Sequence, residues 1–252
     1  MMLQLDQIYK VFDRGKPTEV TAVNGVSLQL EAGSYTVVVG ANGSGKSTLL
    51  NLIAGSIGVD TGRILLEGKE IQRLSDYKRS RWIARVFQNP LVGTAASLSI
   101  LDNFRMAALR RSPKWMKRGV DSRFRELVAE RLVSLGMGLE NKLAQPMGTL
   151  SGGQRQAITL LMTVMAGVEV LLLDEPTAAL DPRSAREVME IADRIVRENK
   201  LTALLVTHNI SEALRYGNRL IQMENGKVVR DYSRQEKALL SQAEVVTWFD
   251  YY

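Results

Sequence analysis

The stretch over residues 40–48 constrains the fold of this chain more than any other feature. It reads Gly-Ala-Asn-Gly-Ser-Gly-Lys-Ser-Thr and matches the pattern G-x-x-x-x-G-K-[ST]. A β-branched run at 36–39 precedes it, and a stretch at 47–54 with the apolar content of a helix follows, ending at Gly55. A buried parallel strand, a glycine loop and a helix in this order predict an α/β fold whose loop surrounds phosphate groups.

The residue types in this loop are those that phosphate binding requires. Glycines allow the backbone to bend so that successive N–H groups point inward, and the following helix start adds the positive end of its dipole. Lys46 can place its ammonium between the β- and γ-phosphates of a nucleotide, and the Ser47 hydroxyl can bind Mg²⁺. The expected nucleotide contacts are Gly40, Ala41, Asn42, Gly43, Ser44, Gly45, Lys46, Ser47 and Thr48.

Two adjacent acids, Asp174 and Glu175, follow the apolar run at 170–173. Carboxylates at the end of a buried strand are costly unless a cation is nearby, so this pair indicates chemistry. Asp174 fits a second Mg²⁺ ligand acting through water, and Glu175 fits the base that orients an attacking water.

A second short string, Leu-Ser-Gly-Gly-Gln at 150–154, opens an apolar helical stretch that reaches residue 165. Ser151 is the expected N-cap, and the two glycines allow a ligand to approach the helix start closely. The stretch at 157–173 is shorter and more polar than the ~20 apolar residues of a membrane span. A buried helix followed by a buried strand is expected there, so the chain should not cross a membrane by itself.

These strings, followed by Val-Leu-Leu-Leu-Asp-Glu-Pro at 170–176, resemble the ATP-binding cassette (ABC) family, the ATPase subunits of ABC transporters. The resemblance extends from residue 3 to about residue 230. It implies a P-loop NTPase core with a mainly parallel sheet, an N-terminal antiparallel β subdomain and an inserted α-helical subdomain. It also implies an enzyme that hydrolyses MgATP.

The resemblance assigns roles to residues that the sequence alone leaves ambiguous. Asp174 and Glu175 correspond to the family's magnesium acid and catalytic base. His208, the single histidine, matches the switch histidine that contacts the γ-phosphate. Gln88 matches the Q-loop glutamine, which senses Mg²⁺ and the attacking water, and Asp181 matches the D-loop residue that crosses a dimer interface.

The resemblance further implies that ATP lies between two subunits. In the family, the string at 150–154 closes on ATP held by the phosphate loop of another subunit, which predicts a two-fold dimer with a second copy or a paralogue. The residues expected to contact nucleotide in this way are Ser151, Gly152, Gly153 and Gln154. Adenine is expected to stack on an aromatic residue near the first strand, either Phe12 or Tyr9, with Phe12 preferred.

The sequence pattern divides the single domain into three parts. The α/β core with its β subdomain is expected at 1–89 and 151–235, the helical subdomain at 90–150, and a C-terminal helix at 236–252. Ser99 and Asp102 predict a helix start, and Asp181 with Pro182 predicts another. One apolar helical stripe is predicted to end at Gly136; its members are Phe124, Leu127, Val128, Leu132 and Leu135.

Composition restricts the partners. The chain has no cysteine, which excludes disulfides and cysteine metal sites, and its net charge of +6 permits an anionic partner. Eight basic residues gather between 105 and 125, on a surface that is simply solvated or that meets lipid headgroups or a partner. Specific nucleic-acid binding is not expected, because no recognition motif accompanies this charge. The N-terminus lacks the pattern of a secretory signal, which favours the cytoplasm.

Two features favour an importer within the ABC family. The stretch before residue 150 lacks the glutamate-rich element of exporters, and the segments 93–95, 155–162 and 216–220 resemble tryptophan/tyrosine-type uptake ATPases. This resemblance implies a transmembrane permease subunit as partner, a solute-binding protein as indirect partner, and a peripheral position on the inner face of the cell membrane. Amino acids or related small solutes are then the expected cargo. The alternative is a soluble single-cassette ATPase of an assembly such as iron–sulfur cluster biogenesis.

Overall fold

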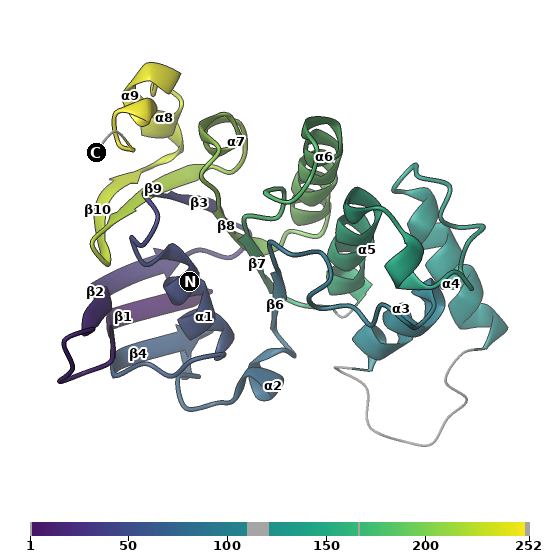
Figure 1. Cartoon of the computed structure of the whole chain (residues 1–252), viewed down its shortest axis with the longest axis horizontal. Coiled ribbons are helices and arrows are strands. Elements are labelled where there is room, and N and C mark those ends of the chain that lie inside the picture. Colours follow the sequence, from purple (N-terminus) through teal and green to yellow (C-terminus); the bar gives the residue numbers. More distant parts are fainter. Residues whose placement is uncertain (1, 110–120, 166, 250–252) are drawn as a thin grey trace. The chain divides into compact units, whose positions relative to one another are not determined.

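The computed structural model describes residues 2–109, 121–165 and 167–249 (Figure 1). The chain divides into two compact units. Unit 1 contains residues 1–85, 170–175 and 200–252, and unit 2 contains residues 86–169 and 176–199. The helical segment predicted at 90–150 lies within unit 2, and its separation as a subdomain of its own stays a prediction.

Unit 1 begins with an antiparallel sheet whose strand order is β2-β1-β4-β5. Its strands are β1 (Leu3–Phe12), β2 (Val20–Leu30), β4 (Thr61–Leu66) and β5 (Lys69–Glu70). Leu3 pairs with Leu30 and Leu5 with Leu28, so the apolar side chains of neighbouring strands share one face. The antiparallel β subdomain that the family resemblance implies is thus present, and β1 and β2 lie within the first 35 residues.

A second sheet has the strand order β10-β9-β3-β8-β7-β6. Its strands are β3 (Tyr35–Val39), β6 (Ile83–Val86), β7 (Val170–Asp174), β8 (Thr202–Val206), β9 (Arg219–Glu224) and β10 (Lys227–Tyr232). β3 is parallel to β8 and β9, and β7 is parallel to β8. Every residue of β3, β7 and β8 is buried, which explains their continuous apolar runs.

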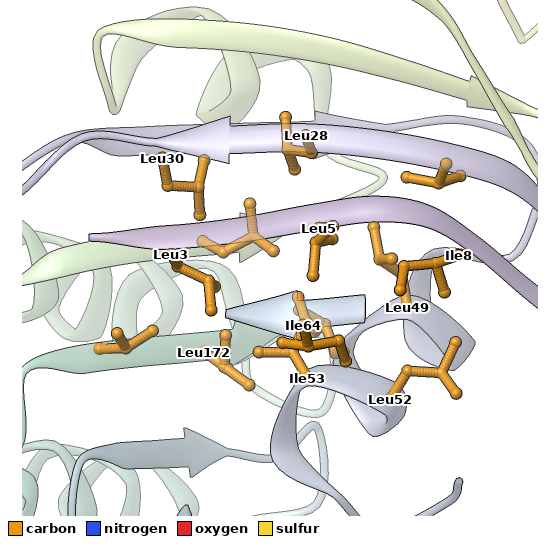
Figure 2. Close-up of a cluster of buried hydrophobic side chains, with 14 of the residues drawn as sticks. Leu3, Leu5, Ile8, Leu28, Leu30, Leu49, Leu52, Ile53, Ile64 and Leu172 are labelled. Atoms are coloured by element: carbon orange, nitrogen blue, oxygen red, sulfur yellow. The ribbon is translucent and has the colours of Figure 1, made fainter. Parts of the chain in front are cut away.

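The core of unit 1 lies where the antiparallel sheet meets α1 (Lys46–Ala54) and β7. Figure 2 shows Leu5 and Ile8 of β1 close to Leu49 and Ile53 of α1, with Leu172 of β7 beside them. All five side chains are nearly inaccessible to solvent. This packing holds α1, and with it the glycine loop that precedes α1, against both sheets.

The C-terminal segment differs from its prediction. Instead of one helix over 236–252, the structure has two short helices, α8 (Arg234–Lys237) and α9 (Gln242–Val246). Each begins with its own capping box, at Ser233 and Ser241, and these caps start separate helices. Trp248 is nevertheless buried and stacks on Tyr232 with ring centroids 5.4 Å apart.

Unit 1 also contains α2 (Asp76–Arg79) and α7 (Ile210–Arg215), and unit 2 is built from longer helices. The helices of unit 2 are α3 (Ile100–Ala108), α4 (Ser122–Val133), the 3₁₀ turn η1 (Met147–Thr149), α5 (Gly152–Met165) and α6 (Pro182–Glu198). Ser99 caps α3 and Asp181 caps α6, as predicted. None of the described helices is both long and apolar enough to cross a bilayer.

The apolar stripe of α4 is only partly as predicted. Val128 and Leu132 are buried, whereas Leu127 is 40% exposed and does not belong to the buried face. The helix ends at Val133, ahead of the predicted end at Gly136, so the buried Leu135 lies beyond it. Leu127 directly precedes Val128, and adjacent helical residues point in directions about 100° apart. Most of the basic segment noted in the sequence, residues 110–120, lies outside the described residues.

Candidate functional site

The glycine loop joins β3 to α1 and adopts a backbone that only glycine accommodates. Gly40 has φ 149° and Gly45 has φ 97°. A Cβ atom at either position would lie 2.2 Å from a backbone oxygen, that of Met223 beside Gly40 and that of Ala22 beside Gly45. The loop therefore depends on these glycines for close packing as well as for its backbone angles.

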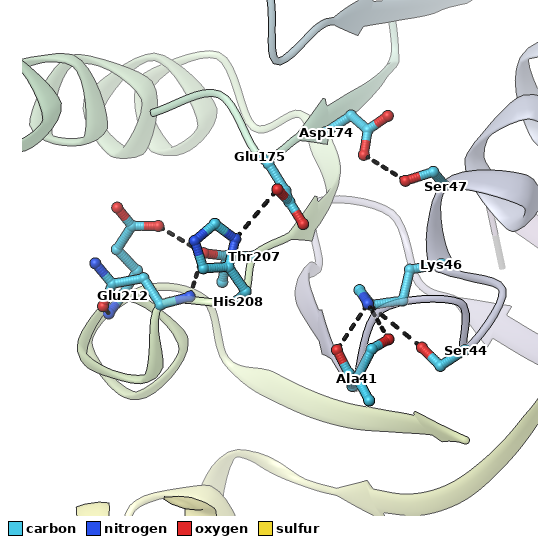
Figure 3. Close-up of polar contacts among 11 residues, drawn as sticks. Ala41, Ser44, Lys46, Ser47, Asp174, Glu175, Thr207, His208 and Glu212 are labelled. Carbon is cyan, nitrogen blue, oxygen red and sulfur yellow. Dashed lines mark hydrogen bonds and ion pairs between the residues drawn. The ribbon is translucent and has the colours of Figure 1, made fainter. Parts of the chain in front are cut away.

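Lys46 is buried within the loop that it follows (Figure 3). Its Nζ donates hydrogen bonds to the carbonyl oxygens of Gly40 (2.7 Å) and Ala41 (2.8 Å). Burial lowers the pKa of Lys46, and the nearby carboxylates of Glu175 and Asp174 partly offset this effect. The loop thus holds a cation at its centre, where an anionic group would be attracted.

Asp174 ends β7 and faces the start of α1. The Ser47 hydroxyl donates to Asp174 Oδ1 at 3.1 Å, which brings together the two expected oxygen ligands of Mg²⁺ (Figure 3). A hydroxyl and a carboxylate are hard oxygen donors of the kind that Mg²⁺ prefers. Among the described residues, no cluster of three His, Cys, Asp or Glu side chains is placed to hold a metal. This donor set fits a Mg²⁺ ion that completes its shell with water and phosphate.

Arg85, in β6, is a site neighbour that was not predicted from the sequence. Its guanidinium donates to Asp174 Oδ2 at 2.5 Å and also to the Asn51 side chain on α1. The available signal was a charged residue within the otherwise apolar strand Ile83–Val86. Asp174 was expected to need a cation nearby, and this arginine supplies one.

Glu175 and His208 form a pair at the same edge of the sheet (Figure 3). Nδ1 of His208 lies 3.1 Å from Glu175 Oε2, with the histidine side chain 58% exposed and the glutamate 17% exposed. Glu175 has φ 45° although it is not glycine and is followed by a proline. Such a backbone costs roughly 1–3 kcal/mol and persists only where the surroundings hold it. One restraint is the hydrogen bond from Glu175 N–H to Val206 O, 2.9 Å long.

The two candidates for adenine stacking differ in exposure. Phe12, at the end of β1, is 39% exposed, and the ammonium of Lys10 lies 5.5 Å from its ring centroid. The ring of Tyr9 is turned against Gly25, where an added Cβ would lie 2.8 Å from the tyrosine oxygen. Phe12 therefore offers the freer ring face, and its role stays a prediction.

Unit 2 contains the residues of the second string. Ser151 caps α5 as predicted, because its Oγ accepts from the N–H of Gln154 while the Gln154 side chain accepts from the N–H of Ser151, both at 3.2 Å. Gly152 and Gly153 allow neighbouring side chains to pack closely, since added Cβ atoms would lie 2.9 Å from Leu180 and 3.0 Å from Ser184. A cavity of about 500 Å³ borders Ser151, Gly153 and Gln154, so this helix start is accessible within unit 2.

Asp181 and Gln88, two further predicted site residues, also lie in unit 2. Asp181 accepts from the N–H groups of Arg183 and Ser184, and its hydrogen bonds with Ser184 lower the pKa of its carboxyl. Ser184 also lies against Gly153, so Asp181 and the start of α5 are close neighbours. Gln88 follows β6 in an exposed bend.

Gln156 is a second residue that was not predicted from the sequence. It is buried on α5, and its amide nitrogen donates to the carbonyl oxygens of Phe87 and Pro176, both at 2.9 Å. The signal was a polar amide at the beginning of the apolar run 157–162.

Comparisons with known proteins agree with this geometry. Residues 23–178 match the family described as ABC transporter. The tyrosine transport ATP-binding protein of Clostridioides difficile is 39% identical over 99% of both chains. The phosphonates import ATP-binding protein PhnC 1 of Cupriavidus metallidurans is 36% identical over 83% of this chain and 76% of the relative. The glycine betaine uptake system ATP-binding protein YehX of Escherichia coli is 34% identical over 91% of this chain and 70% of the relative.

Solved structures show the same fold. The ATP-binding cassette MJ0796, a dimer bound to ADP and Pi, superposes with a TM-score of 0.78 at 26% identity over 92% of this chain and 99% of that chain. The ADP conformation of the cassette MJ1267 gives a TM-score of 0.78 at 27% identity over 98% of this chain and 97% of that chain. The predicted ABC ATPase fold is therefore confirmed. The chain belongs to the ABC transporter family, in which it is an ATP-binding subunit that hydrolyses ATP.

Proposed function

We propose that ATP binds to the glycine loop at 40–48, with its phosphates around Lys46. The observation that carries this proposal is the convergence, within unit 1, of a buried ammonium, a hydroxyl–carboxylate pair and a carboxylate–imidazole pair. The residues that carry these groups follow the carboxyl ends of β3, β7 and β8, and open parallel sheets bind their ligands at this edge.

Mg²⁺ would be held by Ser47 and Asp174, and Gln88 remains the further ligand expected from the family resemblance. When bound, the ion supplies charge stabilisation for the transferred phosphoryl group. Arg85 keeps the second oxygen of Asp174 engaged, so Oδ1 remains directed toward Ser47. The carboxylate is thereby oriented before any ligand arrives.

Glu175 acts as the base that orients and deprotonates the attacking water. Its strained backbone and its contact with His208 fix the direction of the carboxylate. His208, which is more exposed than Glu175, contacts the γ-phosphate, so binding of this phosphate affects the position of α7. Thr207 fixes this turn, because its hydroxyl donates to Glu212 and accepts from the N–H of Asn209.

The residues of unit 2 complete the site of a second subunit. Ser151, Gly152, Gly153 and Gln154 present a helix start with a positive dipole end to the γ-phosphate, and Asp181 lies at the interface. Support comes from the accessible cavity beside this helix start and from the dimeric state of the similar cassette MJ0796. The partner is a second copy or a paralogue, and Phe12 stacks on the adenine ring.

The ATP-binding subunit drives import through a separate transmembrane permease. The permease holds this subunit at the inner face of the cell membrane. The names of three relatives support this proposal, because they refer to tyrosine transport, phosphonate import and glycine betaine uptake. The relative that is similar over its whole length favours an amino acid or a related small solute as cargo, delivered by a solute-binding protein. An assembly ATPase, the alternative function, is not favoured by these names.

The decisive experiment is Glu175→Gln. This variant should bind MgATP with unchanged affinity, hydrolyse it about 10²–10⁴-fold more slowly and accumulate as a dimer, as measured by phosphate release and by size-exclusion chromatography with ATP. Glu126→Gln, an exposed change on α4, serves as the control. Normal turnover in the Glu175 variant would remove this residue from the role of base. Co-purification with a polytopic membrane protein tests the transport assignment separately.

A further inference from the structure

The polypeptide around Glu175 is restrained on both sides of a strained residue. On the amino-terminal side, the N–H of Glu175 donates to Val206 O at 2.9 Å. On the other side, the carbonyl of Pro176 accepts a hydrogen bond from the buried amide of Gln156 at 2.9 Å. Because Glu175 has φ 45° and precedes proline, its conformation is one that an unrestrained chain would leave.

The same amide reaches a second functional segment. Its other hydrogen bond goes to Phe87 O, also at 2.9 Å, and Phe87 directly precedes Gln88. A primary amide has two N–H donors, and here they engage two carbonyls that are 89 residues apart in the chain. Three segments therefore meet at Gln156: the helix that Ser151 opens, the turn that leads to Gln88 and the turn that leaves Glu175.

We propose that Gln156 is a positioning residue for ATP hydrolysis, which orients Glu175 through Pro176 and Gln88 through Phe87. This inference rests on the proposed roles of Glu175 and Gln88. Gln156 touches no substrate itself. It lies two residues after Gln154, so a displacement of the start of α5 is transmitted through one side chain to both catalytic segments.

A purely structural role would give a different result from this proposal. Loss of a buried glutamine whose two N–H groups are bonded lowers stability whatever its role in catalysis, because two carbonyls lose their hydrogen-bond donor. Thr163 provides the comparison on the same helix, because it is buried and its hydroxyl donates to Leu160 O within α5. Thr163→Val removes a buried donor without changing the hydrogen bonds to Phe87 and Pro176.

The experiment measures kcat, KM and the melting temperature of the full-length chain carrying Gln156→Met, which keeps the side-chain length and removes both donors. Because small misplacement of catalytic groups is costly, kcat should fall about tenfold or more while KM for MgATP changes less than about twofold. Thr163→Val should lower the melting temperature less, because it removes one local hydrogen bond, and should leave kcat unchanged. Equal kcat values for the two variants would overturn the proposal.

Two further variants keep the result interpretable. Gln156→Leu also removes both donors and introduces no charge, so it replaces the methionine variant if that protein does not fold, and the same fall in kcat is expected. Glu175→Gln, measured in parallel, separates the two hypotheses. If that variant hydrolyses ATP normally, the proposed catalytic base is wrong; if it is inactive while both Gln156 variants turn over normally, only the positioning role is wrong.

Discussion

The buried polar side chains of unit 1 differ from those of unit 2 in their charge. Those of unit 1 include five charged residues, namely Lys46, Arg79, Asp174, Glu212 and Lys237. Among the described residues of unit 2, the buried polar side chains are neutral; they are Asn103, Gln156, Thr159, Thr163 and Thr177. Burial of charge is costly, so the buried charges of unit 1 need polar partners, such as the carbonyl oxygens beside Lys46, Arg79 and Lys237, whereas unit 2 is held by neutral hydrogen bonds.

The two glycine-rich helix starts show the same contrast. α1 begins at Gly45, and none of the described side chains caps it, so its N–H groups and Lys46 remain directed at the loop. α5 is capped reciprocally by Ser151 and Gln154. The first helix start has no side-chain cap, which suits a polyanion, whereas in the second the reciprocal cap occupies the N–H groups of Ser151 and Gln154. Unit 1 should therefore bind ATP alone, with unit 2 contributing only when a dimer closes.

The largest effect is expected from Lys46→Ala, which removes the buried cation of the phosphate loop. Loss of a buried hydrogen-bonded charge should weaken ATP binding by about 2–5 kcal/mol, and hydrolysis should fall by about 10³-fold or more. Titration with a fluorescent ATP analogue and phosphate-release assays measure the two quantities. Lys69→Ala, an exposed change on β5, should leave both unchanged. Wild-type affinity in the Lys46 variant would contradict the assignment of ATP binding to unit 1.

Ser151→Arg addresses the other helix start and should separate binding from hydrolysis. The arginine blocks the approach of a phosphate held by another subunit, so hydrolysis should fall about 10²-fold or more. ATP binding to the monomer should change little, because its phosphate loop is intact. The same titration and assay apply, with Ser151→Thr as the control that retains a capping hydroxyl. Loss of binding to the monomer would show that the two helix starts do not act in different subunits.

A pair of glycine substitutions measures how differently the two loops use glycine. Gly45→Ala should cost about 1–3 kcal/mol through its positive φ alone, and overlap with Ala22 O adds to this loss. Gly152→Ala meets the end of the flexible Leu180 side chain at 2.9 Å, and alanine favours the helix by about 0.5–1 kcal/mol. Urea unfolding gives both free energies. Equal losses would show that the loops are constrained alike.

Much of this architecture could be predicted because it is encoded locally. The strand, loop and helix around Lys46 follow from residue type and order, and so do the N-caps at Ser99, Ser151 and Asp181. The acids at 174 and 175 were identifiable because an apolar run ends there. These inferences need only a few neighbouring residues.

The remaining features depend on contacts between distant segments. Gln156 is important because the carbonyls of Phe87 and Pro176 lie beside it, and no sequence pattern states which carbonyls will need a donor. Arg85 likewise meets Asp174 across 89 positions. The C-terminal error was different in kind, since it was local: the Ser-x-x-Glu patterns that start at Ser233 and Ser241 are in the sequence, and the prediction of one helix did not use them.

The smallest effect, and a direct test of the charge contrast, is the pH dependence caused by Lys237. Burial lowers the pKa of Lys237 to about 8 from its usual 10.5, although its Nζ donates to the carbonyls of Tyr216 and Gly217. Below pH 8 both the folded and the unfolded chain carry this proton, so the folded state bears the cost of burying the charge. Between pH 8 and 10.5 the unfolded chain binds more protons, so deprotonation stabilises the folded state as pH rises.

Lys237→Met and Lys237→Arg remove this titration, one by eliminating the charge and the other by making it permanent. The stability of wild type relative to each variant should therefore rise with pH in this window, by at most about 1.4 kcal/mol per pH unit. Urea unfolding at about pH 7, 8, 9 and 10 measures the differences. The stability of wild type relative to either variant should rise with the same slope against pH, even if the two variants differ in absolute stability, because neither residue 237 side chain titrates in this window. A difference that is independent of pH for both variants would contradict the lowered pKa of Lys237 and show that burial of this ammonium carries no penalty.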